Sequence, residues 1–320
     1  MELNAKAPIL LETLIDDPGE VEGIFARNAP YTPLGGWFRP DRDGDEAKSP
    51  MWFQKDWVHA DFSAQGSDLF FHHPRMLAAA REFYSAEVVV PRTIYVNLMA
   101  AISECGPAHT DNPTFRGRDR TNTPMMLLRA MFWSGLFERW YIRQATSVWW
   151  MNDVEGGGFR YWPDGPHAAP SRHRQPMANT ALLGDNHGMF HQVEPVGPFE
   201  GGTLGVPASS ELAPLADGSG DWAVTHSGRA LFRAPFSDYR ASVLWKADIY
   251  ASEAERVELA EDRLSLAELC RIFNRDLAER DAALRVDLSR IQDPSLPSEL
   301  AEFYPEATPL AAGKSMFDPN

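Results

Sequence analysis

The chain has 320 residues, of which 44% are hydrophobic, and a formal net charge of −15 from 30 basic and 45 acidic residues. This length and composition suit one large domain with a packed core, while the excess of acidic residues argues against a protein that binds nucleic acid through its phosphates. No apolar run reaches about 18 residues, so we expect no membrane-spanning segment.

Two further features favour a cytoplasmic protein. Cys105 and Cys270 are the only cysteines. They are too few for a disulfide scaffold, and we expect both to be reduced thiols. The residues that follow Met1 lack the basic stretch and apolar run of a signal peptide.

The first part of the chain is expected to combine an irregular arm with helices, over residues 1–87. Pro74 marks the start of a helix over 75–86, where apolar residues recur at helical spacing. Residues 88–99 are rich in β-branched side chains and predict a buried strand. A second helix is expected over 124–137.

From residue 143 onward the pattern is typical of β structure. We expect strands at 146–151, 159–163, 180–183, 189–193 and 240–250, and a hairpin from 222–225 and 230–233. The strands at 180–183 and 189–193 flank a glycine-containing turn and also predict a hairpin. Short strands between Gly/Pro turns, with helices before them, favour an α+β fold built on an antiparallel barrel or jelly roll.

The chain is expected to end in a helical segment. Residues 253–289 carry an apolar stripe at helical spacing, which predicts a helix that packs on the sheet or against the same helix of a homodimer partner. We therefore divide the chain into one domain over 1–250 and a C-terminal helical extension over 251–320.

A candidate metal site lies just after the strand at 88–99. His109 and Asp111 are separated by one residue and follow a Gly106-Pro107 turn, so both side chains are able to face one ion. A third ligand from a distant strand would complete the set of two histidines and one carboxylate that non-haem Fe(II) oxygenases use. This set leaves coordination positions open for oxygen chemistry.

Four polar features follow one another in the order of the Fe(II)/2-oxoglutarate-dependent oxygenase superfamily, which residues 88–250 resemble. They are the His-x-Asp pair, the glycines at 156–158, His191 in the segment His-Gln-Val-Glu-Pro-Val, and Arg240-x-Ser242 on the last strand. The resemblance implies a double-stranded β-helix, a jelly-roll or cupin-like barrel. It also implies that His109, Asp111 and His191 bind Fe(II), and that Arg240 and Ser242 hold the distal carboxylate of 2-oxoglutarate.

One departure from the family leaves the third ligand open. The arginine usually follows the second histidine closely, whereas residues 192 to 239 separate His191 from Arg240 here. Either an insertion over 197–238 interrupts the barrel, or His226 or His187 is the ligand. We prefer His191 because its segment resembles the ligand strand of the family.

The resemblance implies a dioxygenase that uses O2 to oxidise a small molecule, such as an amino acid or natural-product intermediate, by hydroxylation or a related reaction. The alternatives are a cupin-like metal enzyme that does not use 2-oxoglutarate, or a ligand-binding barrel without catalysis. Arg116 is open to a structural or a substrate-binding role. Four aromatic residues are candidates to shield the oxidant, although each also suits a plain core: Trp149, Trp162, Phe190 and Trp245.

Overall fold

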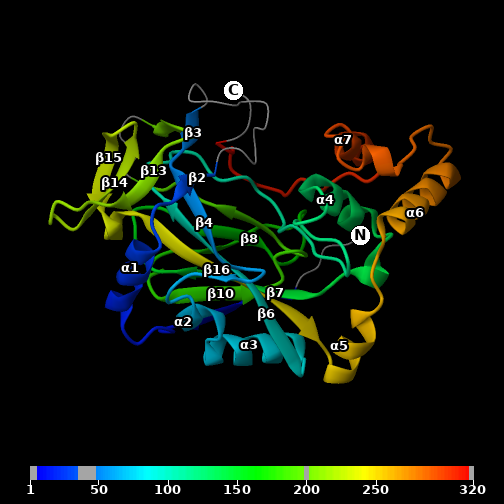
Figure 1. The fold of residues 1–320 in the computed structure, drawn as a ribbon, viewed down its shortest axis with the longest axis horizontal. Helices are drawn as coiled ribbons and strands as arrows, with labels where there is room; N and C mark the ends of the chain where they lie inside the picture. The colour runs from blue at the N-terminus through cyan, green and yellow to red at the C-terminus, as the bar shows by residue number, and fades with distance from the viewer. Residues whose placement is uncertain (1–5, 35–47, 198–201, 317–320) are drawn as a thin grey trace.

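The computed structural model describes residues 6–34, 48–197 and 202–316, and a large antiparallel sheet lies at its centre (Figure 1). Five of its strands are β10 (Thr180–Gly184), β7 (Gln144–Trp150), β16 (Arg240–Tyr250), β6 (Val88–Met99) and β4 (Trp52–His59), in that order. At the edges, β1 (Ile9–Glu12) pairs with β10, while β2 (Thr32–Pro33) and β5 (Phe62–Ser63) pair with β4. The strands predicted at 88–99, 146–151, 180–183 and 240–250 are therefore confirmed.

A smaller antiparallel sheet carries the remaining predicted strands of the central region. It has the order β11 (Phe190–Val193), β8 (Phe159–Trp162), β9 (Ser171–His173). Residues 102–109 run antiparallel beside β11, through bridges at Ile102–Val196 and His109–His191. The chain thus passes repeatedly between the two sheets, from β6 to 102–109, to β7, to β8 and β9, to β10, to β11 and finally to β16.

The expected hairpin between 180–183 and 189–193 is wrong. β10 pairs with β1 and β7 in the large sheet, whereas β11 pairs with β8 in the small one. The glycine-containing turn between them carries the chain from one sheet to the other. The prediction failed because the two strands, although close in sequence, each pair with strands that are distant in sequence.

The segment between β11 and β16 forms small sheets of its own. β14 (Asp221–His226) and β15 (Arg229–Pro235) form the predicted hairpin, and β13 (Glu211–Pro214) adds a third strand. β12 (Gly205–Pro207) pairs with β3 (Lys48–Pro50). Figure 1 shows the β13–β14–β15 sheet at one end of the molecule, near α1 (Pro18–Arg27).

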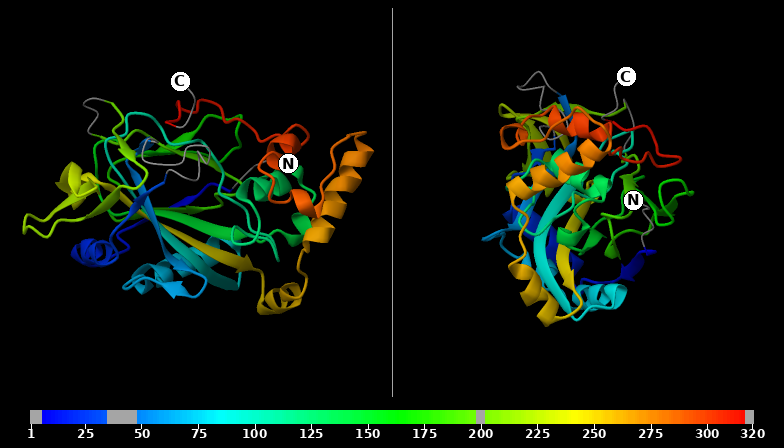
Figure 2. Two further views of the ribbon diagram at one scale, coloured as in Figure 1. Left: turned by 45° about the horizontal axis from the view of Figure 1, so that its top comes forward. Right: turned by 90° about the vertical axis from the view of Figure 1, so that its right-hand side faces the viewer.

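Helices lie below the large sheet and at the end opposite the β13–β14–β15 sheet (Figures 1 and 2). The first group includes α2 (Asp68–Phe71) and α3 (Pro74–Tyr84), and the second comprises α4 (Met125–Ser134), α6 (Leu266–Glu279) and α7 (Leu296–Ala301). α3 and α4 confirm the two predicted helices. Among the described residues, no helix combines the length and the apolar character that a membrane crossing requires.

The C-terminal region is helical, but not without interruption. α5 (Glu253–Ala260) and α6 are separated by residues 261–265, and between α6 and α7 the chain forms only a short 3-10 turn at Leu288–Arg290. Ser265 caps α6 by accepting a hydrogen bond from the Glu268 backbone N–H at 3.1 Å, so the sequence restarts a helix there. The apolar stripe of α6 is buried against α4 and the chain around α7.

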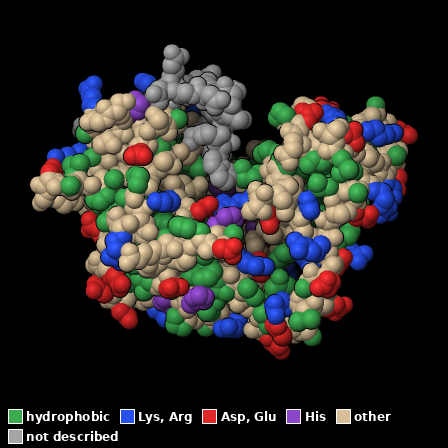
Figure 3. Space-filling model, in the orientation of Figure 1, with side chains coloured by type: hydrophobic (Ala, Val, Ile, Leu, Met, Phe, Trp, Pro, Cys, Tyr) green, Lys and Arg blue, Asp and Glu red, His purple; other side chains and the backbone are tan. Residues whose placement is uncertain are grey.

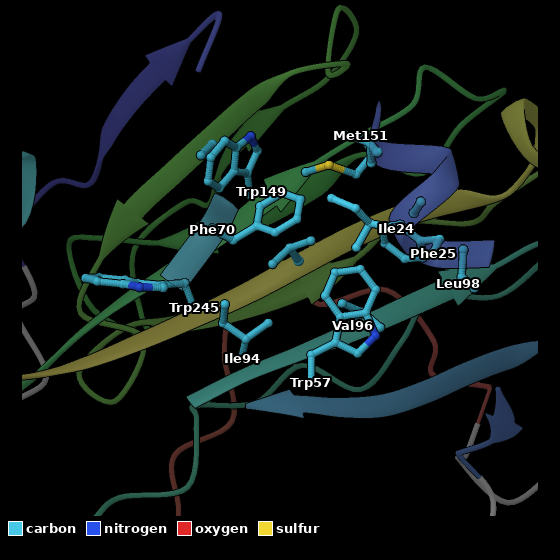
Figure 4. Packing of buried hydrophobic residues seen from close by; sticks show 14 of the residues in the cluster. Ile24, Phe25, Trp57, Phe70, Ile94, Val96, Leu98, Trp149, Met151 and Trp245 are labelled. Carbon is cyan, nitrogen blue, oxygen red and sulfur yellow. The ribbon is translucent and has the colours of Figure 1, made fainter. Parts of the chain in front are cut away.

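The main core fills the space between one face of the large sheet and helices α1, α2 and α3. Figure 4 shows large aromatic residues from separate elements meeting there, among them Phe25, Trp57, Phe70, Trp149 and Trp245. Phe70 and Trp149 pack edge to face with ring centroids 5.2 Å apart. Because this face is closed by helices, the opposite face of the sheet is the one that borders the cavity described next.

Candidate metal centre and its cavity

His109 and His191 lie directly opposite each other on adjacent antiparallel strands. The His109 backbone N–H donates to the His191 carbonyl at 3.0 Å, and the His191 N–H donates to the His109 carbonyl at 2.9 Å. The centroids of the two rings are 4.4 Å apart. This reciprocal pair of backbone hydrogen bonds holds His109, which lies in an isolated bridge, directly opposite His191 on β11.

Asp111 completes a group of three. Its backbone N–H donates to the Asn186 carbonyl at 2.8 Å, which ties the His-x-Asp segment to the turn before β11. Its Oδ1 lies 3.6 Å from Nε2 of His191. One ligand atom each from His109, Asp111 and His191 lies within 4.8 Å of the others, and among the described residues this is the group of His, Cys, Asp and Glu side chains able to hold a metal ion.

The hydrogen bonds of the rings leave the same nitrogen available on each histidine. Nδ1 of His109 lies 2.8 Å from the Pro107 carbonyl, and Nδ1 of His191 lies 3.2 Å from the Met189 carbonyl. A carbonyl accepts a proton but cannot donate one, so each Nδ1 carries hydrogen and each Nε2 presents a lone pair. Metal-binding histidines are held in this way by a second hydrogen bond.

The protonation states also suit a metal. Burial, together with the positive charge that His191 would carry, lowers the pKa of His109 to about 3. Burial likewise lowers the pKa of His191. Burial alone would raise the pKa of Asp111, but the ammonium group of Lys246 and the neighbouring histidines hold it below its ordinary value. Two neutral imidazoles and a carboxylate are the forms that coordinate metal ions.

Arg240 is buried on β16 without an acidic partner. It is 2% exposed, its Nε donates to the Gly157 carbonyl at 2.7 Å, and its guanidinium lies 5.8 Å from the Trp150 ring centroid. Neither its Nη2 nor the Oγ of Ser242 has a hydrogen-bond partner among the described residues. Burial lowers the pKa of Arg240 to about 9. A buried cation with a free donor is costly unless an anion is bound beside it.

The three candidate ligands, Arg240 and Ser242 line one cavity of about 1540 Å³. Figure 3 shows a hollow in this face of the molecule, with histidine side chains visible within it. The cavity is large enough for a keto acid together with a second small molecule. Its walls include Lys246, whose Nζ lies 2.8 Å from Oδ2 of Asp111, and Arg129, which donates to the Thr110 carbonyl at 2.7 Å.

The structure distinguishes His191 from His226 and His187, the two other histidines that the sequence left as possible third ligands. His226 lies on β14, in the sheet at the end of the molecule, and is not part of the group around Asp111. His187 is fully buried, and its Nδ1 lies 3.0 Å from the Tyr141 hydroxyl. His187 stands near Asp111 without contributing to the group of three.

Other expectations for the cavity need correction. The four aromatic residues proposed as a shield do not line it: Trp149 and Trp245 belong to the main core, and Trp162 and Phe190 to the cluster around α4 and α6. Arg116, whose role the sequence left open, lines the cavity and also has structural contacts, since it donates to the side chain of Asp262 and to the Arg139 carbonyl.

Sequence reasoning missed Lys246, although a signal for it was present. Side chains alternate along a strand, so the predicted strand over 240–250 puts Arg240, Ser242 and Lys246 on one face. Arg129 is different. It reaches the metal-binding segment from α4, and its spacing from Thr110 carries no recognisable pattern.

No protein-family model matches the chain, and no curated protein matches it. Solved structures do resemble it. An oxidoreductase of the 2OG-Fe(II) oxygenase family from Burkholderia pseudomallei has 10% identity over 77% of this chain and 86% of that one, with a TM-score of 0.41. A prolyl-4-hydroxylase from Pseudomonas putida has 12% identity over 77% and 94%, with a TM-score of 0.38.

A third similar structure is SnoN, a non-heme alpha ketoglutarate dependent epimerase from nogalamycin biosynthesis. It has 13% identity over 76% of this chain and 77% of that one, with a TM-score of 0.40. All three similar structures share 10–13% of their residues with this chain. The functional conclusion rests on the residues of the site.

Proposed function

We propose that the protein is an Fe(II)- and 2-oxoglutarate-dependent oxygenase that oxidises a small molecule and releases succinate. The observation that carries this is the pairing of two unlike sites in one cavity. His109, Asp111 and His191 present the donor atoms for Fe(II), and Arg240 with Ser242 presents buried donors that lack an acceptor.

The proposal includes the fold that would support this chemistry. We infer a double-stranded β-helix, because successive strands from β6 to β16 alternate between a large and a small antiparallel sheet. Residues 1–250 would form the oxygenase domain, 197–238 an insertion between the last two barrel strands, and 251–320 a C-terminal helical extension.

Each residue has a defined task in this scheme. Nε2 of His109 and His191 and one oxygen of Asp111 would hold Fe(II), leaving three positions open. Iron bound with 2-oxoglutarate would supply activation of O2, coupled to decarboxylation of the keto acid. Arg240 would bind the distal carboxylate of 2-oxoglutarate through two parallel N–H donors, a contact that lysine cannot reproduce. Phe159, which stacks on His191, would exclude water from the metal side of the cavity.

The alternative without 2-oxoglutarate is less well supported. In a cupin-like enzyme of that kind Arg240 would be an ordinary structural residue with its donors satisfied by the protein. Its Nη2 has no such partner among the described residues. The buried guanidinium therefore favours an anionic co-substrate over an uncharged one.

Anaerobic addition of Fe(II) and 2-oxoglutarate tests the proposal directly. The wild-type protein should develop a weak visible charge-transfer band, and aerobic incubation with a panel of amino acids should reveal substrate-stimulated succinate release. Asp111→Ala and His191→Ala should lose iron, the band and succinate while keeping a native circular dichroism spectrum. His226→Ala is the matched control and should retain its iron, the band and succinate release within a few-fold.

Two results would contradict the proposal. Absence of the band in iron-loaded wild-type protein would exclude chelation of the keto acid. Loss of iron from His226→Ala but not from His191→Ala would move the third ligand to β14.

A further inference from the structure

A second cation on β16 contacts the candidate metal ligand itself. Lys246 is 14% exposed, and its Nζ lies 2.8 Å from Oδ2 of Asp111, which is 7% exposed. The other oxygen of this carboxylate, Oδ1, lies 3.6 Å from Nε2 of His191. The two oxygens of Asp111 are thus divided, one toward the metal-binding histidine and the other toward the ammonium group.

On the face of β16 that carries Lys246, the neighbouring acid Asp248 does not compete with Asp111 for the ammonium group. Two residues further along the same face of β16, Asp248 is already bound by Nε of Arg92 at 2.5 Å and by Nε2 of Gln144 at 2.7 Å. On β16 itself, Lys246 lies in the centre of the large sheet, paired in register with β6 on one side and β7 on the other. The ammonium group therefore reaches Asp111 from a strand that is paired on both sides, just before a shift in register against β6.

This division matters because a carboxylate is able to bind a metal through one oxygen or through both. With two histidines, a carboxylate that uses one oxygen leaves three positions of an octahedral ion open, and one that uses both leaves two. Chelation of a keto acid takes two positions. A carboxylate bound through both oxygens would therefore leave none for O2.

We propose that Lys246 is a positioning residue that keeps Asp111 a one-oxygen ligand by holding Oδ2, and so preserves the third open position. This inference rests on the proposed metal centre and adds to it a residue that the sequence motif does not contain. Residues that orient a metal ligand in this way tune the site without touching the ion.

Counting the water molecules on bound Mn(II) tests the proposal without measuring turnover. The count comes from broadening of the Mn(II) electron paramagnetic resonance signal in ¹⁷O-enriched water. Wild-type protein should show three waters, and one should remain after 2-oxoglutarate is added. Lys246→Met keeps an unbranched stem of similar length but removes the charge. It should show two waters alone and none with 2-oxoglutarate.

Two further variants make the result specific. Lys246→Arg keeps a charged donor and should restore the wild-type count. Lys246→Gln, with a neutral polar end, serves if Lys246→Met does not fold by circular dichroism, and should show the count expected for the methionine variant. Three waters in folded Lys246→Met or Lys246→Gln would overturn the proposal, because Lys246 would then only neutralise Asp111 when no metal is bound. Failure of wild-type protein to bind Mn(II) at all would instead overturn the metal centre on which the inference rests.

Discussion

Both faces of β16 carry fully buried side chains, but they differ in what surrounds them. One face enters the main core between the sheet and the helices through Ala241, Val243, Trp245, Ala247 and Ile249. The other borders the cavity through Arg240, Ser242, Leu244, Lys246 and Asp248. Trp245 is 0% exposed and Arg240 is 2% exposed. Burial alone therefore does not distinguish core from site.

The distinguishing feature is whether polar atoms are satisfied. The core face contributes almost only hydrocarbon, which gains free energy by leaving water. The cavity face contributes a guanidinium nitrogen and a hydroxyl that lack partners among the described residues. Such groups cost stability unless a ligand meets them, so they mark where the protein is organised for binding rather than for folding.

The largest expected effect lies on the core face. Trp245→Ala should lower the free energy of unfolding by about 3–5 kcal/mol, because a fully buried ring and its hydrogen bond to the Phe71 carbonyl are lost. Chemical denaturation of the metal-free protein measures this. Leu244→Ala, one residue away but on the cavity face, is the matched control and should cost distinctly less. Equal losses would mean that the two faces share one packing environment.

A smaller effect, of a different kind, is expected on the cavity face. Arg240→Lys should weaken 2-oxoglutarate binding by on the order of 2–3 kcal/mol, or about 30- to 150-fold, since a point charge replaces a two-pronged donor. Iron content should stay unchanged. Titration of the charge-transfer band with 2-oxoglutarate under nitrogen gives the affinity. An unchanged titration would make Arg240 a structural residue and remove the contrast between the faces.

The effect that is smallest per pH unit concerns the free-energy cost of burying a neutral histidine beside the site. Burial, together with the positive charge of Lys246, lowers the pKa of His187 to about 3. Between pH 6.5 and 3 the unfolded chain therefore takes up a proton at this residue while the folded chain does not, and stability falls as the pH falls. One such group contributes up to about 1.4 kcal/mol per pH unit.

Unfolding of metal-free protein measured at several pH values between 6.5 and 4 checks this. His187→Asn should show a shallower loss of stability than wild type over this range. A steeper loss in His187→Asn would indicate that His187 is protonated in the folded state.

The sequence predicted the positions of helices and strands better than it predicted which strands pair with each other. Residues 240–250 were identified as one strand because β-branched and aromatic side chains alternate there with polar ones, and the structure has the same bounds. The expected hairpin at 180–193 failed because hydrogen-bond partners are chosen among distant segments, which local pattern does not reveal. The break in the helix at 261–265 was missed because the apolar spacing continues across it.

In the candidate site as well, features local in sequence were predictable and long-range contacts were not. His109 and Asp111 were recognisable because they are neighbours in sequence, and the structure brings His191 to them through strand pairing. Lys246 was overlooked because a lysine in a strand is usually solvated at its charged end. Alternation along 240–250 places Lys246 on the cavity face, but its contact with Asp111 joins residues far apart in sequence, which no local pattern encodes.

The segment between β11 and β16 has a consequence for chain evolution. β11 is held by β8 and by residues 102–109, and β16 by β6 and β7, so neither strand relies on the connection between them for its position. Loop-closure entropy rises only logarithmically, and each doubling of a connection costs about 0.6 kcal/mol. A change in the length of this connection therefore costs little loop-closure entropy, as long as Trp222 and Val224 of β14 keep their places in the main core. A search for related chains by fixed distance between histidine and arginine would pass over those that vary at this connection, whereas one that scores the two strands separately would find them.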